Sequence, residues 1–122
     1  MKRILLCLLL LVACNSETKT NAPLYDYDVE ERIKELGIDL PKLGKPVANY
    51  VHAVRTDNLV FLAGKGPKDV NGNYIKGKVG VDLTVEEGYK AAKMVGILQL
   101  AALKQEIGDL NNVVRIVKVL GM

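Results

Sequence analysis

PVANYVHAVRTDNLVFLAGKGP, residues 46–67, is the stretch that decides the fold. Its first part, over 47–56, is rich in β-branched and aromatic residues, and LVFLA at 59–63 is continuously apolar. Asp57 and Asn58, between these two runs, tolerate the left-handed backbone of a tight turn. The stretch therefore predicts a β-hairpin whose second strand is buried on both faces.

Helices are predicted on either side of this hairpin. Asp28 can cap a short amphipathic helix over 29–36. Thr84 and Glu87 form a capping box at the start of a long helix over 85–106, whose apolar residues recur at helical spacing. Each helix has an apolar face that needs a partner, and the hairpin can provide one.

The last segment, VVRIVKVL at 113–120, has the composition of a strand. A strand, a helix and a second strand joined by short links require a right-handed crossover, which places the two strands in parallel. The sequence therefore predicts an α+β domain with a mixed sheet and helices packed on one face.

The N-terminus has the pattern of a secretory signal. Lys2 and Arg3 precede an apolar run from Ile4 to Cys14, which is shorter than the roughly 20 residues of a spanning helix. LVAC, ending at Cys14, resembles the bacterial lipobox, which implies cleavage before Cys14 and acylation of its sulfur. An ordinary signal peptide with an incidental cysteine is the alternative. We expect a signal over 1–13, a tether over 14–28, and an exported chain anchored by lipid in the bacterial envelope, with the outer membrane or the periplasmic face favoured over the cytoplasm.

Composition narrows the possible functions. The formal charge of the 122 residues is +3, and it falls to +1 when Lys2 and Arg3 leave with the signal, so no nucleic-acid partner is expected. Cys7 would leave as well and Cys14 would be acylated, which excludes cysteine chemistry in the mature protein.

Few single residues suggest catalysis. His52 is the one histidine, so neither a Ser-His-Asp triad nor a histidine metal site can be assembled, and we expect no metal and no cofactor. Glu86 and Glu87 fit helix capping better than an acid and base pair. The lysines in the loop after the hairpin fit a solvated loop better than an RNA-binding patch, because Tyr74 is the one aromatic residue among them; they are Lys65, Lys68, Lys76 and Lys78.

Whole segments are more informative. Residues 46–67, then GKVGVDLTVEEGYKAAK at 77–93, then GDLNNVVRIVKVLGM at 108–122 resemble the Rid family, the YjgF-type reactive intermediate deaminases once grouped as endoribonucleases. The resemblance implies a fold like that of bacterial trimeric chorismate mutase, homotrimers, and sites in the clefts between subunits. The implied activity is hydrolysis of enamine and imine intermediates to 2-keto acids and ammonia.

The resemblance also implies site residues. Tyr50 matches the tyrosine of the family's first strand, and Ala63, Gly64 and Lys65 stand where many members have Ser-Gly-Gln. A half-buried strand aromatic is the alternative reading of Tyr50. The family's carboxylate-binding arginine matches neither Arg55 nor Arg115, so no catalytic residue is identified.

In the family that arginine, a second helix and further strands follow the strand that here ends at Leu120. We therefore expect residues 29–122 to be the N-terminal portion of a Rid-like domain, incomplete at the C-terminus and inactive alone. The alternatives are a Rid-fold module that binds a small molecule or assembles as a trimer without catalysis, and, less favoured, an endoribonuclease.

Overall fold

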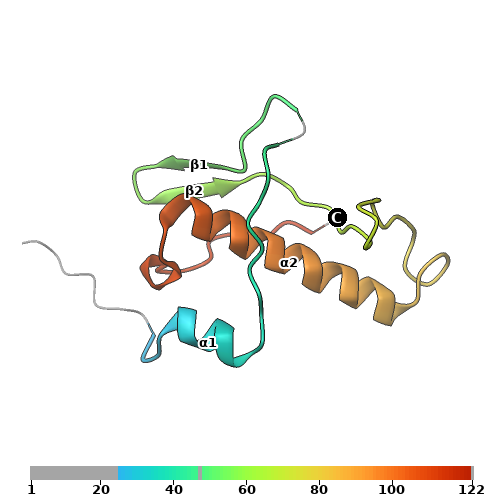
Figure 1. The fold of residues 1–122 in the computed structure, drawn as a ribbon, viewed down its shortest axis with the longest axis horizontal. Helices are drawn as coiled ribbons and strands as arrows, with labels where there is room; N and C mark the ends of the chain where they lie inside the picture. Colours follow the sequence, from blue (N-terminus) through green and yellow to red (C-terminus); the bar gives the residue numbers. More distant parts are fainter. Residues whose placement is uncertain (1–24, 47, 122) are drawn as a thin grey trace, which may run out of the picture.

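The computed structural model of the chain describes residues 25–46 and 48–121. The predicted signal, Cys14 and most of the predicted tether lie outside these residues. The elements follow in the order α1 (Val29–Glu35), β1 (Ala53–Thr56), β2 (Leu59–Leu62), α2 (Val85–Ile107) and the 3₁₀ helix η1 (Leu110–Asn112), as Figure 1 shows.

β1 and β2 form the predicted antiparallel hairpin. Thr56 pairs with Leu59 across the turn, and Asp57 takes the left-handed backbone expected there, with φ of 49°. The prediction that the second strand is buried on both faces is wrong. Val60 and Leu62 pack against the core, whereas Phe61 on the other face is 60% exposed. One face of the hairpin is covered by helix, and the other is open.

The long helix α2 begins as its capping box predicts. The Glu87 carboxylate accepts hydrogen bonds from the backbone N–H and the hydroxyl of Thr84, each at 2.8 Å, and Thr84 Oγ1 accepts one from the Glu87 N–H. Glu86 pairs instead with Lys90 one turn on, at 3.1 Å. These contacts confirm that the two glutamates serve the helix. Gly108, with φ of 82°, provides the left-handed residue that ends it.

The core lies where α1, η1 and the last turns of α2 meet. Ile33, Leu103 and Leu110 are buried there, and Leu110 is 1% exposed. The first turns of α2 extend away from this corner (Figure 1), and Tyr89 on them is 70% exposed. Among the described helices, none combines the length and apolar character needed to cross a membrane.

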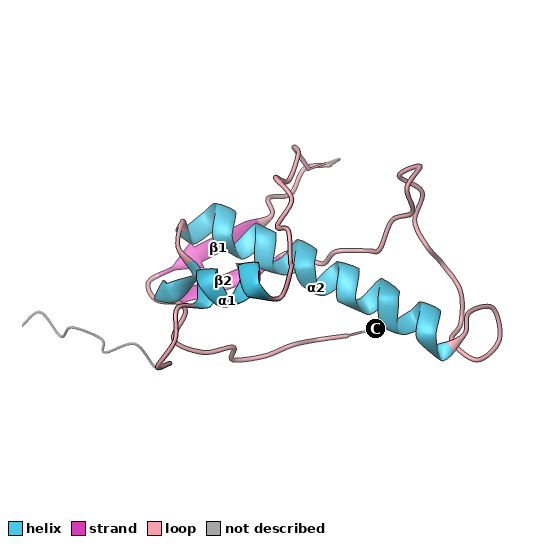
Figure 2. Cartoon of the chain, turned by 60° about the horizontal axis from the view of Figure 1, so that its bottom comes forward, coloured by secondary structure: helices cyan, strands magenta, loops and turns pink. Residues whose placement is uncertain are grey.

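The prediction of a parallel strand over 113–120 is wrong. The described residues contain one sheet, of β1 and β2, and the segment after η1 runs back toward the start of α2 as an extended loop (Figure 2). Val119 on this segment is 82% exposed. A strand needs a neighbour for its backbone N–H and C=O groups, and composition alone does not provide one. The α+β class, with α2 on one face of the hairpin, is confirmed, while the described sheet is antiparallel rather than mixed.

Candidate functional site

The residues that the family resemblance groups together lie at one end of the hairpin, opposite its turn. Ala53 at the start of β1 pairs with Leu62 at the end of β2, and the pairing continues one step further, where the Ala63 N–H donates to the His52 carbonyl at 3.0 Å. Tyr50 leads into this end, and Gly64 and Lys65 follow from it. Tyr50 therefore lies two residues before the point where the segment over 63–65 leaves the hairpin, and the neighbour of its ring is His52.

The Tyr50 ring is partly open to solvent. It is 44% exposed and stands edge-on to the His52 ring, with 6.4 Å between ring centroids and 74° between planes. An aromatic pair of this geometry holds a ring in place while leaving one side accessible. The arrangement fits a packing role and leaves room for a ligand contact.

The carbonyl of Ala63 is held by two side chains. Lys65 Nζ and Gln99 Nε2 each donate to this oxygen at 3.2 Å (O···N). Gln99 comes from α2, so this contact fixes the end of the hairpin to the helix that covers it. Burial lowers the pKa of the Lys65 amine, because desolvation disfavours its charged form.

Sequence reasoning did not single out Gln99. It lies between Leu98 and Leu100 in the helix, and its side-chain oxygen is buried with no hydrogen-bond partner in the part of the chain that the structure describes. The sequence signal that could have identified Gln99 is a polar residue within the apolar face of an amphipathic helix.

The glycines on either side of Lys65 differ in their surroundings. A Cβ added at Gly64 would meet no atom within 4 Å, so the space over this residue is open. A Cβ added at Gly66 would lie 2.8 Å from the Tyr74 ring, which rests against the backbone there. Lys65 therefore lies between Gly64, which borders open space, and Gly66, which is covered by the Tyr74 ring.

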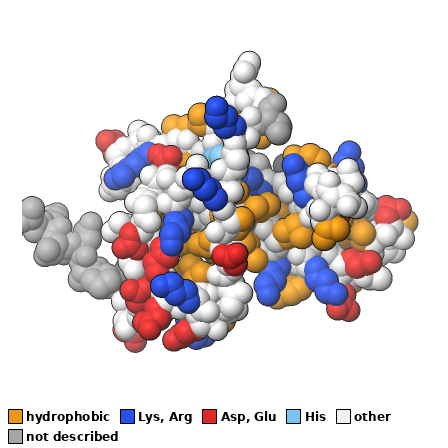
Figure 3. Space-filling view, in the orientation of Figure 1, with side chains coloured by type: hydrophobic (Ala, Val, Ile, Leu, Met, Phe, Trp, Pro, Cys, Tyr) orange, Lys and Arg blue, Asp and Glu red, His pale blue; other side chains and the backbone are white. Residues whose placement is uncertain are grey.

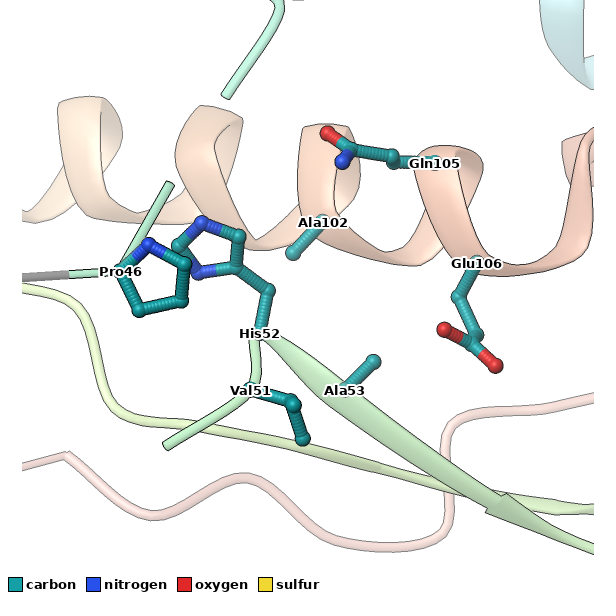
Figure 4. A pocket seen from close by; sticks show the side chains of 7 residues that line it. All are labelled: Pro46, Val51, His52, Ala53, Ala102, Gln105 and Glu106. Atoms are coloured by element: carbon teal, nitrogen blue, oxygen red, sulfur yellow. The ribbon is translucent and has the colours of Figure 1, made fainter. Parts of the chain in front are cut away.

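His52 faces a separate hollow of about 240 Å³ between β1 and the end of α2. Figure 4 shows its ring beside Pro46, with Glu106 reaching down from α2 toward the strand. His52 Nε2 donates to the Gly44 carbonyl at 2.8 Å and so ties the segment before β1 to the hairpin, while Nδ1 is buried without a hydrogen-bond partner among the described residues. The lining residues are Pro46, Val51, His52, Ala53, Ala102, Gln105 and Glu106.

The remaining candidates lie elsewhere. Arg55 donates from Nε to the Asp57 carbonyl at 3.1 Å, at the turn end of the hairpin and away from Tyr50. Lys68 stands 4.8 Å from the centre of the Tyr74 ring, a cation–π contact within its own loop. Within 25–46 and 48–121, no cluster of three or more His, Cys, Asp and Glu residues could hold a metal ion.

Comparison with known proteins supports the fold. The chain is 34% identical over 90 residues to Protein TCP17 of Trypanosoma cruzi, an alignment covering 74% of this chain. It superposes with a TM-score of 0.60 and 29% identity on the crystal structure of a Shewanella oneidensis MR-1 protein provisionally named an endoribonuclease, over 69% of this chain. No protein-family profile matches the sequence.

These matches define a YjgF-like α+β fold. The chain spans 56% of the length of each of the two proteins.

Proposed function

We propose that this chain carries the hairpin part of a Rid-type site for small imine or carbonyl compounds, with hydrolysis of enamine and imine intermediates to 2-keto acids and ammonia as the reaction of the whole assembly. The observation that carries the proposal is the hydrogen bond that joins Ala63 to His52 at the end of the hairpin opposite its turn, with the Tyr50 ring beside His52, in a YjgF-like fold. The ligand would lie over Gly64, where the space is open.

The reaction has two requirements. A cation must hold the substrate carboxylate, and a polar group must place a water molecule against the imine carbon. Lys65 is our candidate for the cation, since it follows Gly64 and its Nζ donates to the Ala63 carbonyl at 3.2 Å. Arg55 is held at the opposite end.

Assembly belongs to the same proposal. Val54 and Phe61 pair across the open face of the hairpin and are 55% and 60% exposed. In the space-filling view, apolar side chains also form a band over α2 (Figure 3). Apolar surface of this kind is typical of protein–protein contacts. We propose that this surface joins copies of the chain, and, as the family resemblance implies, that they form a homotrimer with ligand clefts between them.

Ammonia release by the purified protein tests whether it hydrolyses imines. Ammonia released from 2-iminobutanoate would be measured for the parent chain and for Tyr50→Phe and Tyr89→Phe; Tyr89 is a matched control because it is exposed on α2. Faster release that falls with Tyr50→Phe and persists with Tyr89→Phe supports a site at Tyr50. Because the family's arginine has no match here, we expect the chain alone to bind 2-keto acids without accelerating hydrolysis, and binding lost selectively in Tyr50→Phe supports the same site.

The name of the Shewanella protein favours a second candidate, RNA cleavage. Incubation with single-stranded RNA distinguishes the two functions. Cleavage by the parent chain, unaffected by Tyr50→Phe, would replace the proposed function.

We also propose that the chain is anchored in the cell envelope through Cys14, on the strength of the LVAC sequence. Mass spectrometry of membrane-extracted protein should find an acylated N-terminal Cys14, and Cys14→Ser should block processing. A mature protein with a free Cys14 thiol contradicts the anchor.

A further inference from the structure

The backbone of the segment that follows η1 has no partner within its own chain. Over 114–119, no N–H or C=O group forms a backbone hydrogen bond with another described residue, whereas the Val113 N–H still donates to the Leu110 carbonyl. Val113 is held in place, since it packs against the core together with Val60 and Leu62 of β2. The segment therefore leaves the core from a fixed point and continues as an extended stretch of unpaired donors and acceptors (Figure 2).

The side chains of this stretch are apolar and exposed on both faces. Successive residues of an extended chain point to opposite sides, and Ile116 and Val117 are 60% and 70% exposed. Four of the six residues over 114–119 are valine or isoleucine, which favour strands. A neighbouring strand would pair the free backbone groups and cover part of these side chains.

The hairpin has two free strand edges that differ in charge. β1 and β2 form a two-stranded sheet, so each strand has one edge without a neighbouring strand among the described residues. β1 contains Arg55, whereas β2 (Leu59–Leu62) has no charged residue and follows Asp57 of the turn. Arg115 and Lys118 make the segment basic, and like charges on neighbouring strands are unfavourable. Charge therefore favours the edge of β2 over that of β1, and over a second copy of the same basic segment.

We propose that residues 114–119 of one copy pair as a strand with the free edge of β2 in a second copy. This inference rests on the assembly of copies in the proposed function, and it names the segment that joins them. The added strand would lie next to Phe61 of β2, whose side chain is 60% exposed and would gain apolar neighbours. Each copy gives one segment and receives another, so the contact is heterologous and generates a ring when the rotation between copies closes.

Proline substitutions separate strand pairing from apolar contact alone. Neither the Ile116 nor the Val117 N–H makes a backbone hydrogen bond among the described residues, so the single chain loses no such bond when either residue is replaced by proline. A proline that faces a paired edge removes a bond of the ladder. Successive N–H groups point to opposite edges, so one of Ile116→Pro and Val117→Pro faces β2. Ile116→Ala and Val117→Ala are the matched controls, because they shorten the same side chains and keep the N–H.

The full chain and these four variants would be measured by light scattering for mass and by mass spectrometry for amide exchange. We expect the parent and both alanine variants to contain several copies, and one of the two proline variants to be a monomer. Amides over 114–119 should exchange about tenfold or more slowly in the parent than in that monomer. Exchange around Leu103 should be the same in both, which shows that the variant is folded.

The two measurements separate this inference from the proposed assembly. A parent of several copies whose amides over 114–119 exchange as fast as those of the exposed loop at Val70 overturns the strand pairing and leaves contact through the outer face of the hairpin standing. The strand pairing is also overturned if both proline variants keep the mass of the parent, or if the alanine variants dissociate as fully as the proline variant. A monomeric parent overturns both proposals.

Discussion

The corner formed by α1, η1 and the end of α2 differs from the outer face of the hairpin in almost every physical respect. Leu110 in the corner is 1% exposed, whereas Phe61 on the outer face is 60% exposed. Polar groups in the corner are also matched, since the Glu30 carboxylate accepts from Lys104 and from the Leu110 N–H. The difference indicates that the corner contributes more to stability than the outer face of the hairpin, which is the face that we propose joins copies of the chain.

The largest effect is expected from removing the central side chain of the corner. Leu110→Ala should lower the free energy of unfolding by about 2–5 kcal/mol, since it deletes a buried side chain and leaves a cavity. Leu120→Ala removes the same atoms from a residue that is 74% exposed and should cost less than about 0.5 kcal/mol. Urea unfolding of both variants measures the difference, and equal losses would show that the corner is not the core.

A smaller effect is expected at the polar centre of the corner. Glu30→Gln replaces a carboxylate, 19% exposed as a side chain, that binds both Lys104 and the Leu110 N–H, and should cost about 1–3 kcal/mol. Glu86→Gln is the control, because Glu86 pairs with Lys90 on the exposed surface of α2, where ion pairs contribute little. If the control lost as much stability as Glu30→Gln, the corner would have no special electrostatic role.

The same carboxylate makes stability depend on pH. The hydrogen bond from Lys104, followed by that from the Leu110 N–H, holds the pKa of Glu30 below its ordinary value of 4.5. A depressed folded-state pKa gives stability that is present above the unfolded value and is lost as the pH falls. We expect thermal stability to decline below about pH 4.5, and the decline to be shallower in Glu30→Gln. Parallel pH profiles of parent and variant would contradict this.

The smallest effect is expected at the far end of α2. Thr84→Ala removes the capping hydroxyl and should cost about 1 kcal/mol or less. Because the first turns of α2 extend beyond the corner, the change should appear as faster amide exchange there and not around Leu103. Exchange that rises equally in both places would mean that α2 opens as one unit with the corner.

The sequence predicted those parts of the fold that depend on local signals. Both helices begin at the expected caps, Asp28 and Thr84, and the turn at Asp57 joins the expected strands. The segment over 113–120 was predicted wrongly, because strand composition does not show whether a neighbouring strand is present.

The candidate site could be predicted in part. The first strand was expected over 47–56, whereas β1 begins at Ala53, so the turn at Asp57 predicted the pairing near Ala63 but not the position of Tyr50. Their functional roles came from family resemblance and stay predictions. Gln99 was missed because a single polar residue on a helix gives no indication of its partner, the Ala63 carbonyl, 36 residues earlier in the chain.

The mass of the protein in solution tests the central claim most directly, namely that the open face of the hairpin joins copies of the chain. Residues 21–122 would be measured by light scattering, together with Phe61→Lys and the control Val70→Lys, since Val70 is fully exposed in a loop. The parent and the control should have the mass of three copies, and Phe61→Lys should be monomeric. A monodisperse parent monomer that unfolds cooperatively above about 60 °C, the upper part of the usual mesophile range, would contradict the claim.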